Sequence, residues 1–229
     1  MPIDLPRPLT DYLNAKRSHD THALLATLTA DAVITDEGNT YTGSAAIRDW
    51  NARASAAVHA TYDVKAAERI ADHFVLTVQV AGNFPTSPAT LYFYAALRGE
   101  GIAAMAMLPV RLPNPVAAYV LATNTFNTHA AAETFASDAL VNDIKREFWG
   151  KAAIQRWFES ESAGDRVTMS PTDVREHHGN VTLRAVLNGD YDNTGLPDPL
   201  ELTYYFSLGG DEITQLIIIA NEPAAQGIL

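Results

Sequence analysis

Two stretches of sequence decide the fold: residues 30–50 read ADAVITDEGNTYTGSAAIRDW, and residues 137–157 read SDALVNDIKREFWGKAAIQRW. Each begins with the apolar and β-branched residues of a strand, passes a short polar segment and ends in the apolar spacing of a helix. The helix carries Trp50 in the first stretch and Trp157 at the same place in the second. The same strand–turn–helix unit is therefore predicted twice.

The match between the two stretches extends over nearly the whole chain. At an offset of 107, residues 5–50 align with residues 112–157 without a gap, and 17 of these 46 pairs are identical. After a four-residue insertion the copies realign at an offset of 111, with residues 90–102 over residues 201–213. Self-similarity on this scale indicates an internal duplication. The predicted domains are residues 1–111 and residues 112–229.

Hydrophobic periodicity, together with the proline and cap residues at predicted helix starts, predicts three helices in each copy, followed by strands. Pro8 suits the first turn of a helix that runs to about residue 19. Thr21, with Thr128 in the second copy, is expected to cap a short second helix, and Ser44 a third. Strict alternation over 74–80 predicts a half-buried strand, and a hairpin follows it. The fold class is therefore α+β.

The last strand of the second copy, ITQLIIIA from Ile213, is apolar on both faces at its end. A strand without a solvent face needs cover on both sides. We therefore expect the two sheets to pack back to back as an intramolecular pseudo-dimer. Further pairing into a homodimer is left open.

Composition excludes several classes of partner and site. The 229 residues are 47% hydrophobic and 19% charged, as in a globular protein, and the net charge of −11 disfavours nucleic acid and anionic membranes. The absence of cysteine excludes disulfides, thiolate nucleophiles and Cys-ligated metals. The apolar runs are too short to span a bilayer and no signal segment is recognised, so the expected location is cytoplasmic.

The histidines and glycines predict neither a metal nor a cofactor. His22 and His129 fall in the first turns of short helices, and His177 and His178 are adjacent in an extended segment, where neighbouring side chains point to opposite faces. Neither arrangement is a His–carboxylate metal cluster. Phosphate-binding and dinucleotide fingerprints are also missing from the sequence.

The order of elements resembles the cystatin-like cone shared by nuclear transport factor 2, scytalone dehydratase, SnoaL-like polyketide cyclases and ketosteroid isomerase. The two quoted stretches carry this resemblance most specifically. It implies two tandem cone domains, each with three helices on a curved antiparallel sheet. It also implies a small hydrophobic molecule as the partner, because such cones enclose an apolar pocket.

The resemblance implies candidate catalytic residues. In the isomerase pattern a Tyr of the first helix donates to the substrate carbonyl, and an Asp 24 residues later shuttles the proton. Tyr12 and Asp36 have this spacing, as do Tyr119 and Asp143. A carboxylate at the edge of an apolar cavity loses hydration and becomes a stronger base, and a phenol stabilises the enolate that forms. A turn role for Asp36 and a packing role for both tyrosines stay open.

A second donor position distinguishes the copies. Where the isomerase carries a protonated acid, this chain has Phe93 in the first copy and Tyr204 in the second. A phenylalanine cannot donate a hydrogen bond, so the second pocket is the better catalytic candidate. Trp50, Trp157 and Phe93 are expected to line the pockets.

Three functions follow as alternatives. The first is a cofactor-independent isomerase, cyclase or dehydratase that acts by Asp/Tyr acid–base chemistry on a hydrophobic carbonyl compound. The second is a non-catalytic module for small ligands or protein partners. The third is an epoxide hydrolase or cyclase of the polyether type, in which Asp36 would pair with Asp63.

Overall fold

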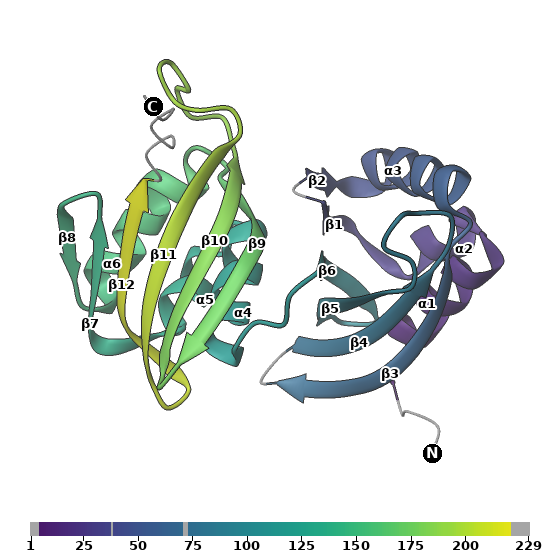
Figure 1. The fold of residues 1–229 in the computed structure, drawn as a ribbon, viewed down its shortest axis with the longest axis horizontal. Helices are drawn as coiled ribbons and strands as arrows, with labels where there is room; N and C mark the ends of the chain where they lie inside the picture. Colours follow the sequence, from purple (N-terminus) through teal and green to yellow (C-terminus); the bar gives the residue numbers. More distant parts are fainter. Residues whose placement is uncertain (1–4, 38, 71–72, 221–229) are drawn as a thin grey trace, which may run out of the picture. The chain divides into compact units, whose positions relative to one another are not determined.

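The computed structural model describes residues 5–37, 39–70 and 73–220, with the side chains of residues 55–58 excepted. The chain divides into two compact units, Met1–Arg111 and Leu112–Leu229 (Figure 1). Each unit holds three α-helices and a six-stranded sheet within this described part.

The first unit begins with two helices, and its third helix separates the short strand β2 from the long strands. Its elements are α1 (Arg7–Ser18), α2 (Thr21–Ala26), β1 (Leu28–Asp36), β2 (Asn39–Thr42), α3 (Gly43–Val58), β3 (Thr61–Ile70), β4 (His73–Ala81), β5 (Ala89–Arg98) and β6 (Gly101–Leu108).

The second unit repeats this order and adds one turn of π-helix, η1, after its third α-helix. Its elements are α4 (Asn114–Asn124), α5 (Thr128–Glu133), β7 (Phe135–Asp143), β8 (Arg146–Trp149), α6 (Lys151–Trp157), η1 (Phe158–Ala163), β9 (Thr168–His177), β10 (Asn180–Asn188), β11 (Leu200–Gly209) and β12 (Glu212–Ala220).

The two sheets have the same topology. Their strand orders are β2-β1-β6-β5-β4-β3 and β8-β7-β12-β11-β10-β9. Neighbouring strands are antiparallel, as expected, except that β1 runs parallel to β6 and β7 parallel to β12. The sheets are therefore mixed, because the helices and long strands between the two ends of each unit return the chain in the starting direction.

The helices of each unit lie against one face of its sheet (Figure 1). In the first unit the core between the layers includes Leu9 and Leu13 of α1, Ile34 of β1, Ile47 of α3 and Leu76 of β4, each buried. These are the apolar positions that the helical and strand periods predicted, so hydrophobic patterning explains how the layers associate.

The short second helices are capped differently from the prediction. Thr21 and Thr128 are each the first residue of the helix, not its cap. Asp20 accepts from the backbone N–H of Ala23 at 2.9 Å, and Asn127 caps the equivalent helix at 3.0 Å. Asp and Asn are both strong capping residues, so the two copies retain the function although the residue differs.

The third helices also begin differently from the prediction, and Gly43 and Gly150 explain why. The third helix of the first unit begins at Gly43 rather than being capped by Ser44, and the N-cap of α6 is Gly150. Both glycines have φ near +75°, and a Cβ on Gly150 would lie 3.2 Å from the carbonyl oxygen of Ser137. Glycine stands at this place in both copies because other residues rarely adopt this conformation.

The packing of one unit against the other as a pseudo-dimer stays a prediction. On the last strand, Ile218 is buried within the second unit, whereas Ile219 is 48% exposed.

We expect the caps to be detectable in stability. Asn127→Ala removes the acceptor for a free helix amide and should lower the free energy of unfolding of the second unit by about 1 kcal/mol. Thr128→Ala is the matched control and should change it by less than about 0.5 kcal/mol. Urea denaturation measures both; an equal loss in the two variants would contradict the assignment of the cap.

Candidate functional site

The second unit has a partly open cavity of about 170 Å³ between its helices and its sheet. Four residues predicted from the sequence meet in its wall: Asp143, Tyr119, Tyr204 and Trp157. The rest of the lining is apolar at Val167, Met169, Leu187, Leu200, Leu202 and Ile218, and polar at Thr123, Glu161, Ser162, Asp165 and Tyr191. Apolar walls with several converging polar groups have the composition of a small-molecule site.

Asp143 ends strand β7 and is 9% exposed. Its Oδ2 accepts a hydrogen bond from Trp157 Nε1 at 3.2 Å and a second one from the guanidinium of Arg146. Within the described residues, no hydrogen bond reaches Oδ1. This oxygen is therefore the one that can accept a proton from a bound molecule.

Tyr119 of α4 and Tyr204 of β11 supply two buried phenols. Burial raises the pKa of Tyr119 well above its usual value, and Tyr204 and Asp143 raise it further. Burial also raises the pKa of Tyr204, and the charge of Asp143 adds to this effect. The two phenols therefore stay protonated and remain hydrogen-bond donors across the physiological range.

Aromatic packing fixes the ring of Tyr119. It meets Phe135, Phe158 and Phe206 edge to face, with centroids 5.9, 5.5 and 5.4 Å away. Such contacts hold an aromatic side chain in one orientation. The hydroxyl of Tyr119 is thus positioned before any ligand arrives.

Arg146 joins two carboxylates at the edge of the cavity. It contacts Asp143, and its Nη1 lies 2.9 Å from Glu161 of η1, which also lines the cavity. The side chains of Arg146 and Glu161 are 51% and 42% exposed. The link is therefore near solvent and contributes little to stability. The sequence analysis did not identify either residue.

The first unit keeps the carboxylate–indole pair. Trp50 Nε1 donates to Asp36 Oδ2 at 3.0 Å, and burial raises the pKa of Asp36 against the opposing effect of this bond. Tyr12 is fully buried, and its hydroxyl has no hydrogen-bond partner among the described residues. Burial raises the pKa of Tyr12 well above normal, with Tyr62 and Asp36 adding to it. Phe93 is also fully buried.

Lys16 is a further residue that the sequence analysis did not identify. It lies one turn after Tyr12 on the buried face of α1 and is 5% exposed. Its Nζ donates to Asn51 Oδ1 at 2.9 Å, and burial lowers its pKa to about 8 although the charge of Asp36 opposes this. The available signal was a lysine four residues after a predicted site tyrosine on an apolar helix face.

The chain is similar to several solved structures. No protein-family model matches the sequence, and no curated protein matches it. A candidate polyketide cyclase from Sinorhizobium meliloti is 32% identical over 45% of this chain and 95% of its own, with a TM-score of 0.45. A ketosteroid isomerase-like protein from Catenulispora acidiphila, solved with trimethylamine, is 23% identical over 45% of this chain and 85% of its own, with a TM-score of 0.41. A nuclear transport factor 2-like protein from Cytophaga hutchinsonii is 16% identical over 49% and 93%, with a TM-score of 0.39.

The first of these similarities covers nearly all of the other protein but about half of this chain. The proteins found are of kinds that the sequence resembles, a polyketide cyclase and a nuclear transport factor 2-like protein. Each domain of this chain has three α-helices against one face of a six-stranded sheet, the layers expected from the sequence (Figure 1).

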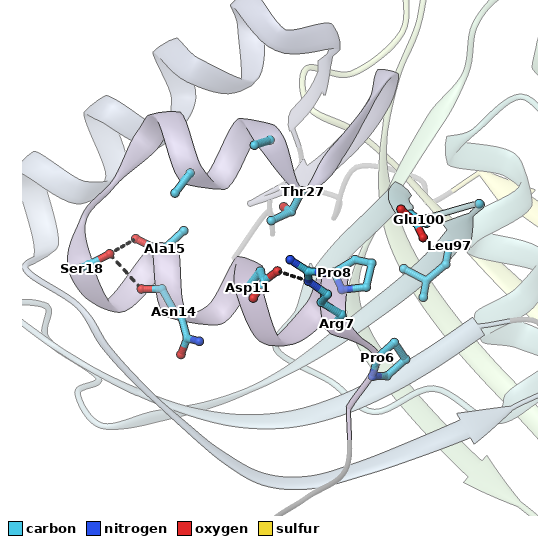
Figure 2. Close-up of a pocket in the computed structure, with 13 residues that line it drawn as sticks. Pro6, Arg7, Pro8, Asp11, Asn14, Ala15, Ser18, Thr27, Leu97 and Glu100 are labelled. Atoms are coloured by element: carbon cyan, nitrogen blue, oxygen red, sulfur yellow. Dashed lines mark hydrogen bonds and ion pairs between the residues drawn. The ribbon is translucent and has the colours of Figure 1, made fainter.

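The first domain also has a larger surface groove, of about 780 Å³ (Figure 2). It is formed by α1, α2 and the turn after β5, and contains none of the predicted site residues. Its polar groups bond one another: Arg7 with Asp11 at 3.4 Å, and Ser18 with the backbone oxygen of Asn14 at 3.0 Å (Figure 2). Volume alone therefore does not identify the chemistry.

The structure also bears on the carboxylate pair of the third alternative, and on metal sites and membrane-spanning helices. Asp63 of β3 bonds to Lys65 and has a side chain 66% exposed, and within the described residues it makes no contact with Asp36. The carboxylate pair of the epoxide-hydrolase alternative is thus not assembled. The described residues form no cluster of three or more metal-binding side chains, and none of their helices is long and apolar enough to cross a membrane.

We expect Lys16 to make stability depend on pH. Its folded pKa is about 8, and an unfolded lysine titrates near 10.4, so between these values the unfolded chain binds more protons. The free energy of unfolding should therefore rise across this range, by up to about 3 kcal/mol from this group. Urea denaturation at pH 7 to 10 should show the rise in the wild type relative to Lys16→Met. The exposed control Lys65→Met should show the same rise in the free energy of unfolding as the wild type. A difference between wild type and Lys16→Met that does not change with pH would contradict the assignment.

Proposed function

We propose that the second domain binds a small, largely apolar carbonyl compound and catalyses proton transfer beside its carbonyl without a cofactor. One observation carries the proposal: a buried carboxylate with an unengaged oxygen shares an apolar cavity with two protonated phenols. This is the set of groups that enolisation requires, because a base must remove the proton while a donor stabilises the oxygen.

The steps follow from the positions of these groups. Asp143 Oδ1 takes a proton from the carbon next to the carbonyl, and the electron pair of that C–H bond forms a C=C bond. The carbonyl oxygen becomes an enolate oxygen, which Tyr204 and Tyr119 stabilise as donors. In a substrate with a second C=C bond conjugated with the enolate, return of the proton to the far end of that bond isomerises the molecule. In a substrate with a second carbonyl, attack of the enolate carbon on it closes a ring.

The size of the cavity favours a ligand with one ring. Its volume of about 170 Å³ is close to the roughly 150 Å³ of an engineered cavity that holds benzene. Sites for drug-sized ligands measure about 300–1,000 Å³. We therefore propose a single-ring ketone or a short chain of similar volume, rather than the polycyclic ligand of a steroid isomerase.

Non-catalytic binding is the second candidate, and Arg146 is the observation that favours it. The ion pair occupies one oxygen of Asp143 and balances its charge, as in a carboxylate with a structural role. A binder would retain ligand without exchanging its α-hydrogens, so the same assay separates the two functions.

The base can be tested by isotope exchange. Cyclohexanone in D₂O should exchange its α-hydrogens in the presence of the protein, as followed by NMR, and Asp143→Asn should slow this exchange by about 100-fold or more. Asparagine keeps an acceptor for Trp157 but is not a base. Asp138→Asn, at an exposed position of the same strand, should behave as the wild type. Exchange at the wild-type rate in Asp143→Asn would rule out Asp143 as the base.

The donor can be tested on the same substrate. Tyr204→Phe gives the second domain the residue that the first has at Phe93, and removal of one donor to a developing oxyanion should lower kcat by about 100-fold. Tyr205→Phe, whose side chain is 44% exposed on the same strand, is the matched control. Equal rates in these two variants would exclude Tyr204 as a donor.

A further inference from the structure

The first domain holds a lysine amine in surroundings that are unusual for a charged group. Nζ of Lys16 donates to Asn51 Oδ1 at 2.9 Å, and within the described residues it forms no ion pair with a carboxylate. It lies 4.7 Å from the ring centroid of Trp50 and 5.4 Å from that of Tyr62. An ammonium buried without an ionic partner is destabilising, even with aromatic faces beside it.

Two groups that can transfer a proton lie close to this amine. Asp36 is near enough for its charge to oppose the lowering of the Lys16 pKa, and burial raises the pKa of Asp36 itself. The hydroxyl of Tyr12, one helical turn before Lys16, is fully buried and has no hydrogen-bond partner among the described residues. A buried donor without a partner is rare in folded proteins and is consistent with a group that a ligand engages.

The duplication shows which residues around this amine are specific to the first copy. At an offset of 107, Tyr12, Asp36 and Trp50 have identical counterparts. Lys16, Asn51 and Tyr62 do not. Their places in the second copy are taken by Thr123, Phe158 and Met169, respectively. These three come from α1, α3 and β3 and meet at one point, so the first copy has a polar centre that the second lacks.

We propose that Lys16 is a nucleophilic amine that forms an imine with a small aldehyde or ketone, which gives the first domain a reactive site distinct from the cavity of the second. The neutral amine forms a C–N bond to the carbonyl carbon, and the π electrons of the C=O bond move to its oxygen. The carboxylate of Asp36 carries one proton from the nitrogen to this oxygen, which gives a carbinolamine. Transfer of the second nitrogen proton to the hydroxyl oxygen lets the C–O bond break and water leave, so that the imine forms with no other reactant and Asp36 ends ionised, as it began.

Ionisation makes this amine more reactive than a surface lysine. Near pH 8 about half of the Lys16 side chains are neutral, whereas an exposed lysine with a pKa near 10.4 is less than about 1% neutral. The neutral fraction therefore differs by on the order of 100-fold. Because the rings of Trp50 and Tyr62 lie close to Nζ, we expect only a small carbonyl compound to react there.

Reductive trapping on the full chain tests the proposal. Propanal with sodium cyanoborohydride at pH 8 converts an imine into a stable propylamine, which peptide mass spectrometry locates. Lys16 should be labelled at least ten times faster than the exposed Lys65 in the same sample, and Lys16→Arg should lose this signal. Labelling of Lys16 at or below the rate of Lys65 would overturn the proposal, and this comparison needs no variant to fold.

The role of Asp36 has its own readout. Asp36→Asn removes a negative charge and should thereby leave more of Lys16 neutral, so an effect through ionisation alone would speed labelling. Loss of a proton donor should instead slow labelling of Lys16 by about tenfold or more. An unchanged or faster rate would exclude Asp36 as the donor. Asp143→Asn should label Lys16 as the wild type does, so a failure here is distinct from a failure of the second-domain chemistry.

Discussion

Both domains depend on one hydrogen bond between an indole and a carboxylate. In each, the tryptophan of the third helix donates to the aspartate that ends the first strand, at 3.0 Å in the first domain and 3.2 Å in the second. The bond ties the helical layer to the sheet at the point where the strand would otherwise end in solvent. It also satisfies one oxygen of a poorly hydrated carboxylate, which would be costly to bury without a donor. An aromatic residue packs on each indole, Tyr41 on Trp50 and Phe148 on Trp157.

This constraint explains why the sequence predicted so much of the fold. Asp36 and Trp50 are 14 residues apart, as are their counterparts Asp143 and Trp157, and the strand, turn and helix between them follow from local patterns. Periodicity and the repeat also predicted the helices, because their apolar stripes are regular. The predicted caps of the second helices were one residue too late. The threonines are identical in the two copies, whereas the actual caps, Asp20 and Asn127, differ.

The parts of the candidate site that the sequence did not reveal come from long-range contacts. Lys16 and Asn51 are 35 residues apart, and Arg146 reaches Glu161 from another element. In the sequence each is an ordinary polar residue with no spacing that links it to a partner. A lysine on an amphipathic helix is normally assigned to the solvent face, but Lys16 lies on the buried face of α1, against residues of α3 and β3. Burial, which changes the chemistry of the amine, is a property of the tertiary structure alone.

The duplication allows the polar centre to change while the frame is retained. In the second domain the donors near the carboxylate are phenols, and Tyr204 contributes one from the sheet. In the first domain Phe93 occupies that sheet position, and the polar hydrogens come instead from α1, through Tyr12 and Lys16. A phenol with a raised pKa can only donate, whereas an amine with a lowered pKa can also supply a lone pair. Moving the polar group from sheet to helix is therefore what separates the two reactions that we propose for the two domains.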